Sequence, residues 1–112
     1  MMLACILKDM DRQDIKSIIQ DELKQNPDLS NAHGVELDRC LIEPIKQTYL
    51  DSFNDNNEIQ LWTVLEETED GDGYKIVYDP EDNIFGLGIK SNKDELIFIG
   101  YYGTFAETLR GM

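Results

Sequence analysis

Four short clusters of turn-forming residues divide the second half of the chain, and they are the strongest constraint on its fold. Residues 51–57, 70–73, 79–83 and 91–94 are rich in Asp, Asn, Gly, Pro and Ser, and they separate stretches rich in β-branched and aromatic residues. Connections this short join antiparallel neighbours, because a parallel crossover needs a dozen or more residues. The pattern therefore predicts a β-meander of four or five antiparallel strands.

The expected strands differ in how they distribute their apolar residues. They cover residues 41–50, 58–66, 74–78, 84–89 and 96–102. Pro44 lies in the first, so that strand is expected at a sheet edge, where a missing N–H is tolerated. Gly86 and Gly88 share one face of the fourth, which allows a helix, a backbone or a ligand to approach closely. The fifth is apolar on both faces, as expected for a central strand or one covered by a partner subunit.

Two segments outside the strands have helical periodicity. Between residues 11 and 25 the apolar residues follow a helical spacing: Ile15, Ile18, Ile19 and Leu23. Asp11 is placed to cap this helix, and Pro27 is expected to end it near Asn26. Residues 35–41 are expected to form a short helical turn.

Near the carboxyl end, Thr104 and Glu107 have the spacing of a capping box. Phe105, Leu109 and Met112 then share one helical face, but the segment is too short to be stable unless it docks on the rest of the fold.

These elements predict an α+β fold in which an N-terminal helix and a short C-terminal helix pack on one face of the antiparallel meander. The length of 112 residues indicates a single globular domain, residues 1–112. If both helices cover the same face, the other face is left with the apolar side chains of Trp62, Val64, Val77 and either Ile97 and Ile99 or Phe98. That arrangement favours a homodimer or a protein partner on the second sheet face.

The net charge of −13 limits the classes of partner. Nucleic acids and anionic membranes are not expected to bind, because both need a basic surface on the protein. The apolar run of residues 1–7 is too short to span a membrane and lacks the basic flank of a signal peptide. We therefore expect a cytoplasmic protein, with Cys5 and Cys40 as reduced core residues.

The sequence contains no recognisable enzyme motif. His33 is the only histidine, and no serine or cysteine lies in a nucleophile motif. The chain contains neither a Walker loop nor a complete GxGxxG, and the acidic run at 66–77 fails the EF-hand pattern. A weak divalent site at Glu69, Asp70 and Asp72 is the remaining metal alternative. We expect no catalytic residue, no cofactor and no specific metal site, so an enzyme is not favoured.

The acidic residues are concentrated in one part of the sequence. Residues 51–82 contain eleven acidic side chains and one basic one, a net charge of −10. In a meander, loop 51–57 and turn 79–83 lie at the same end of the sheet. The candidate partner-binding residues are the acids of that end and two aromatic anchors: Asp51, Asp55, Asp79, Glu81, Asp82, Trp62 and Tyr101.

Three functions follow from this pattern. The leading hypothesis is a non-catalytic, acidic protein-binding module that engages a basic protein, as immunity and inhibitor proteins do. The alternative is a small enzyme or ligand-binding domain with a pocket between helix and sheet near Gly86, Gly88, Tyr101 and Tyr102, using His33. The third is a structural homodimer. Acidic turns that only keep the protein soluble remain the simplest interpretation of the charge.

Overall fold

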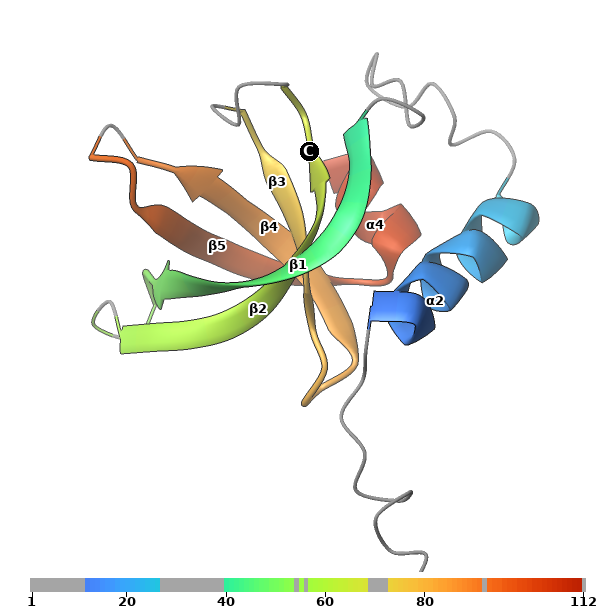
Figure 1. The fold of residues 1–112 in the computed structure, drawn as a ribbon, viewed down its shortest axis with the longest axis horizontal. Helices are drawn as coiled ribbons and strands as arrows, with labels where there is room; N and C mark the ends of the chain where they lie inside the picture. The colour runs from blue at the N-terminus through green and yellow to red at the C-terminus, as the bar shows by residue number, and fades with distance from the viewer. Residues whose placement is uncertain are drawn as a thin grey trace, which may run out of the picture.

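The computed structural model describes residues 12–26, 40–53, 55, 57–68, 73–91 and 93–111 (Figure 1). These residues form two helices and five strands. In chain order they are α2 (Arg12–Gln25), β1 (Leu41–Asp51), β2 (Asn57–Glu66), β3 (Lys75–Asp79), β4 (Ile84–Lys90), β5 (Leu96–Gly103) and α4 (Phe105–Gly111).

The first helix agrees with the sequence prediction. In α2, Ile15 and Ile19 are buried, while Ile18 and Leu23 pack against the same core. The helix ends at Gln25, and the Asn26 N–H donates to the Glu22 carbonyl at 3.0 Å. The expected cap, Pro27, and the helical turn over residues 35–39 lie outside the described residues.

The sheet is the main correction to the predicted fold. Consecutive strands pair antiparallel from β1 to β5 as expected, but the sheet closes into a barrel and is therefore mixed. The closing contact pairs β1 with β5 in parallel, Leu50 opposite Ile97 and Asp51 opposite Phe98. Alternate strands of a meander run in the same direction, so a first and fifth strand that meet must be parallel. Strand twist and β-bulges supply the curvature that brings them together.

Pro44 is tolerated because β1 is only partly enclosed. The pairing of β1 with β2 shifts register between Leu41 and Ile45, and the pairs that β1 forms with β5 lie at the opposite end of β1. Helix α2 lies along this part of the strand, where Arg12 Nε donates to the Pro44 carbonyl at 3.0 Å. The prediction of an edge strand is therefore wrong, because β1 has two neighbours.

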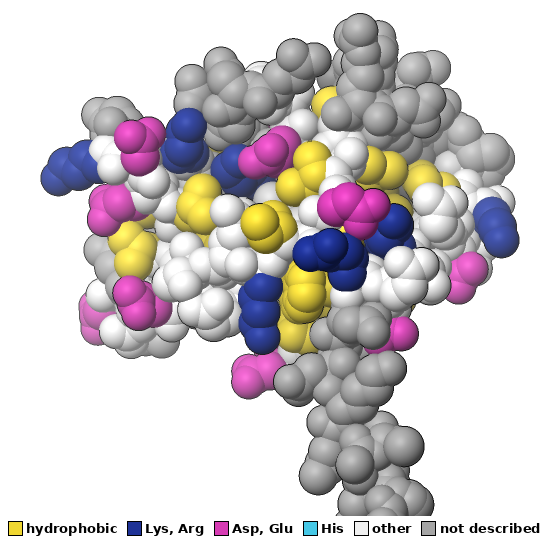
Figure 2. All heavy atoms as spheres, viewed as in Figure 1, with side chains coloured by type: hydrophobic (Ala, Val, Ile, Leu, Met, Phe, Trp, Pro, Cys, Tyr) yellow, Lys and Arg dark blue, Asp and Glu magenta, His cyan; other side chains and the backbone are white. Residues whose placement is uncertain are grey.

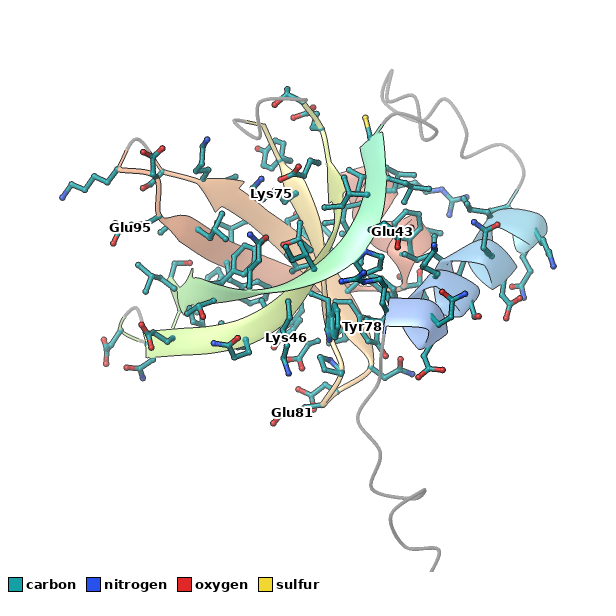
Figure 3. The ribbon with its side chains drawn as sticks, in the orientation of Figure 1. Glu43, Lys46, Lys75, Tyr78, Glu81 and Glu95 are labelled. Atoms are coloured by element: carbon teal, nitrogen blue, oxygen red, sulfur yellow. The ribbon has the colours of Figure 1, made fainter. Side chains whose placement is uncertain are left out.

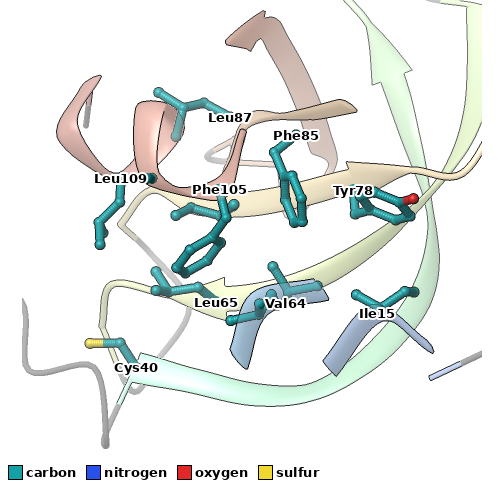
Figure 4. Close-up of a cluster of buried hydrophobic side chains, with 12 residues drawn as sticks. Ile15, Cys40, Val64, Leu65, Tyr78, Phe85, Leu87, Phe105 and Leu109 are labelled. Atoms are coloured by element: carbon teal, nitrogen blue, oxygen red, sulfur yellow. The ribbon is translucent and has the colours of Figure 1, made fainter. Parts of the chain in front are cut away.

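Closure of the sheet produces an inner and an outer face, each with its own hydrophobic cluster. The outer cluster lies between the helices and the sheet, and Figure 4 shows part of it. It consists of Ile15, Ile19, Cys40, Val64, Leu65, Ile76, Tyr78, Phe85, Leu87, Phe105, Ala106 and Leu109. The inner cluster consists of Tyr49, Leu61, Val77 and Phe98. Both helices therefore pack on the outer face, and the opposite face lines the barrel.

The second sheet face, on whose exposure the homodimer prediction depends, lines the inside of the barrel. Val77 and Phe98, expected on a second exposed face, are 1% and 2% exposed inside the barrel. Val64 and Trp62 belong to the helix side instead, where Val64 is buried and Trp62 packs against the outer cluster.

The two glycines of β4 make room for inner-cluster side chains. A Cβ on Gly88 would lie 2.7 Å from Tyr49 Cε2, and one on Gly86 would lie 2.9 Å from Phe98 Cε1. The close approach predicted from their shared face is therefore made by aromatic rings of the same chain.

The amino end of α4 is capped from two places. Its capping box forms as expected, with Thr104 N–H donating to Glu107 Oε1 and Glu107 N–H donating to Thr104 Oγ1, both at 3.1 Å. The first two amides of the helix, Phe105 and Ala106, donate to the two carboxylate oxygens of Glu22 at 3.0 and 2.9 Å. One side chain of α2 thus completes the cap of α4.

Candidate functional site

Tyr101 is an exposed aromatic side chain in a fixed position. Two register shifts in the pairing of β4 with β5 leave Ile99 and Tyr102 without opposite residues, one on each side of the Gly100–Tyr101 pair. Bulges of this kind change the direction of side chains. The Tyr101 ring packs on Phe98 with centroids 4.7 Å apart, yet 42% of the residue is exposed. Its hydroxyl donates to Asp79 Oδ2 at 2.5 Å.

Asp79 connects Tyr101 to the β3–β4 turn. The residue is 5% exposed, and its Oδ1 accepts the Glu81 N–H at 3.0 Å, as in an Asx turn. The same turn is held by Asn83, which has a φ of 53° and accepts the Tyr78 hydroxyl at 2.5 Å. Asp79 therefore orders both the turn and the tyrosine.

Asp51 and Phe53 lie where β1 ends. Asp51 Oδ1 accepts the Phe53 N–H at 3.0 Å, and Ser52 Oγ donates to the Phe98 carbonyl at 2.9 Å. Phe53 is 75% exposed, and a Cβ on Gly100 would lie 3.7 Å from its ring. A second exposed aromatic ring is thus held beside the residue that precedes Tyr101.

Three carboxylates contribute to the electrostatic environment of Tyr101. Burial raises the pKa of its hydroxyl, and the hydrogen bond to Asp79 and the negative charges of Asp79, Asp82 and Asp51 raise it further. Residues from the end of β1 and from the β3–β4 turn therefore act on one hydroxyl group. We call Asp51, Phe53, Asp79, Asp82 and Tyr101 the aromatic–acidic surface.

The other candidate residues lie elsewhere. Asp55 is exposed in the β1–β2 turn with a φ of 54°, and Glu81 is exposed at the β3–β4 turn, where Figure 3 labels it. Trp62 lies on the helix side of β2, opposite Lys46 and Tyr78 of the adjacent strands, whereas Tyr101 packs on the inner cluster. Sequence reasoning did not single out Phe53, although an aromatic residue in the polar run 51–57 was the available signal.

Other described acidic residues are not part of the aromatic–acidic surface. Glu66 accepts a 2.6 Å ion pair from Lys75, which is 3% exposed. Glu95 is exposed in the β4–β5 turn, far from Glu81 in Figure 3. Glu69, Asp70 and Asp72 lie outside the described residues, as does His33.

The face shown in Figure 2 carries both signs of charge over α2 and β1. Arg12, Lys16 and Lys46 lie in these elements, and Lys16 Nζ forms a 2.8 Å ion pair with Glu43. The hydrogen bond from Lys16 lowers the pKa of the Glu43 carboxyl. The described residues of this face therefore mix positive and negative charge.

A groove of about 370 Å³ separates α2 and α4 from the β3–β4 turn. Its lining residues are Ile18, Glu22, Asp82, Asn83, Ile84, Phe85, Gly103, Thr104 and Glu107. It lies between helix and sheet, as the ligand-binding alternative requires, but it is not lined by Gly86, Gly88, Tyr101 or Tyr102. The space beside the two glycines is filled by Phe98 and Tyr49.

Within the described part of the chain, no helix is long and apolar enough to span a membrane, and no group of His, Cys, Asp and Glu side chains is arranged to hold a metal ion. Comparisons with protein-family models, curated proteins and solved structures find no match.

Proposed function

We propose that this protein is a non-catalytic binding module that captures a basic protein through the aromatic–acidic surface. The observation that carries the proposal is the exposed Tyr101 ring, which is fixed by its hydrogen bond to Asp79 and its packing on Phe98. A tyrosine held in this way loses little side-chain entropy on binding, and tyrosine is enriched among interface residues that dominate affinity. Phe53, 75% exposed, adds apolar area next to Gly100.

The charge supports the same assignment. A net charge of −13 attracts cationic partners from a distance, and clustered carboxylates direct them to one part of the surface. The concrete form of the proposal is a cytoplasmic inhibitor or immunity-type protein that covers a cationic site on a toxin or nuclease. Fold alone does not specify this role, so the proposal depends on the surface.

The test is capture of a basic protein from a lysate of the source organism at low and high salt. The paired variant Asp51→Asn with Asp82→Asn should weaken binding about fivefold at low salt, since each exposed charge pair contributes roughly 0.5 kcal/mol. The matched control is Asp21→Asn with Glu95→Gln, which removes the same charge from exposed positions elsewhere. Equal loss in both paired variants, or binding that does not respond to salt, contradicts the proposal.

The groove supports a second candidate, a ligand-binding domain. It combines apolar lining from Ile18 and Phe85 with the carboxylates of Glu22 and Glu107, which suits an organic cation. NMR shift mapping distinguishes the candidates. Shifts confined to Ile18 and Phe85 favour the groove, whereas shifts at Phe53 and Tyr101 favour the aromatic–acidic surface.

A further inference from the structure

The aromatic–acidic surface offers more than negative charge to a partner. Tyr101 and Phe53 are 42% and 75% exposed, and Phe53 lies beside Gly100, the residue before Tyr101. Each of these exposed rings can offer its face to an incoming group. A cation attracted by Asp79 and the carboxylates near it therefore meets the Tyr101 ring, whose hydroxyl is bonded to Asp79.

The hydrogen bonding of Tyr101 limits how it can be recognised. Its hydroxyl proton is committed to Asp79 Oδ2, and its ring already contacts Phe98. The group left to a partner is the exposed part of the ring, made more electron-rich because the hydroxyl donates to a carboxylate. Tyr101 is thus arranged to accept a cation on its face and not to donate a hydrogen bond.

Carboxylates are fixed around these rings. Asp51 is held by its bond to the Phe53 N–H, Asp79 is held by Tyr101 and the Glu81 N–H, and Asp82 follows in the ordered turn. All three act electrostatically on the Tyr101 hydroxyl. The chemistry required of a partner group is therefore a positive charge, a flat face and several donors directed at carboxylates.

We propose that the aromatic–acidic surface selects arginine over lysine in the basic segment that it binds. This inference rests on the proposed function. A guanidinium group is planar, stacks on aromatic rings and donates to carboxylates from a rigid fork, whereas an ammonium group is a compact, strongly hydrated charge. A surface made only of carboxylates would bind the two cations through charge alone, and the rings supply the discrimination.

The experiment uses two acetylated, amidated peptides in which glycine alternates with arginine or with lysine, so that their charges are equal. Binding to the full chain is followed by NMR titration. The arginine peptide is expected to bind about threefold more tightly, the size typical of an exposed cation–π contact. A third peptide with citrulline in place of arginine keeps the flat shape without the charge and should not bind.

Two variants separate the aromatic contribution from a general preference for arginine. Phe53→Leu with Tyr101→Leu should make the two cationic peptides bind equally, while Glu95→Gln should preserve the preference. Equal binding of both peptides to the unmodified protein overturns the arginine proposal and leaves the proposed function standing. A preference that persists in the double leucine variant also overturns it. Failure of both peptides to shift Asp51, Asp82 or Tyr101 resonances overturns the proposed function as well.

Discussion

Replacing Glu22 with alanine tests how the two helices are joined. Glu22 supplies both acceptors for the first two amides of α4, at 3.0 and 2.9 Å, and Phe105 and Ala106 are 0% and 5% exposed. The next amide, that of Glu107, is satisfied within the capping box. Removing the carboxylate therefore leaves two N–H groups at the start of α4 without their acceptor.

The expected cost follows from these contacts. A hydrogen bond to a charged group contributes about 1.5 to 3 kcal/mol, but Glu22 is half-buried and water can replace part of the interaction. We expect Glu22→Ala to lower the free energy of unfolding by about 2 kcal/mol, which corresponds to a Tm decrease of roughly 8 °C. Glu22→Gln, which keeps one acceptor oxygen and loses the charge, should cost about half as much.

Thermal and urea unfolding measure the loss, and amide hydrogen exchange locates it. The exchange of Phe105 and Ala106 should accelerate more than that of residues in β2. Asp21→Ala is the matched control, because it removes the same charge from the neighbouring, exposed position of α2. If both variants lose stability equally, the cap does not stabilise the protein and the reasoning is wrong.

Two further predictions concern the inside of the barrel. Gly88→Ala should lower the free energy of unfolding in urea by about 1 to 3 kcal/mol, because its Cβ would meet the buried Tyr49 ring. Gly111→Ala, whose Cβ meets the half-exposed Tyr102 ring, should lower it far less. Equal losses in the two variants would contradict the packing argument. Burial raises the pKa of Tyr49 from 10 to about 12, so its contribution to stability is complete below pH 10 and is lost as pH rises toward 12. Stability measured across this range should fall less steeply in Tyr49→Phe, and an unchanged slope would rule out the assignment.

Local features of this fold follow directly from the sequence. The spacing of Ile15 and Ile19 defines the buried face of α2, and the Thr104–Glu107 pair defines the start of α4. The turn clusters define the strand order. These predictions depend on neighbours within one element or one hairpin, where periodicity and capping rules apply.

Barrel closure could not be predicted in the same way. It depends on twist accumulated over five strands and on bulges whose positions have no clear signature in the sequence. The same bulges orient Tyr101. The hydrogen bond from the Tyr101 hydroxyl to the buried Asp79 could therefore not be predicted from the sequence either. Asp51 and Asp82 both act on the Tyr101 hydroxyl. Trp62 lies on the face of the sheet that the helices cover. The alternation of apolar and polar residues along β2 does not specify which face that is.

The parallel contact between β1 and β5 also has a consequence for the order of folding. Each of the other four strand pairings joins segments that are adjacent in the sequence, so each can form early as a hairpin. Leu50 and Ile97 are separated by nearly half the chain, and Glu22 meets α4 across a still longer interval. Long-range contacts form only after the intervening chain has been ordered. During synthesis, therefore, one edge of β1 stays unpaired until β5 has been made, and the barrel can close only after this last strand is available.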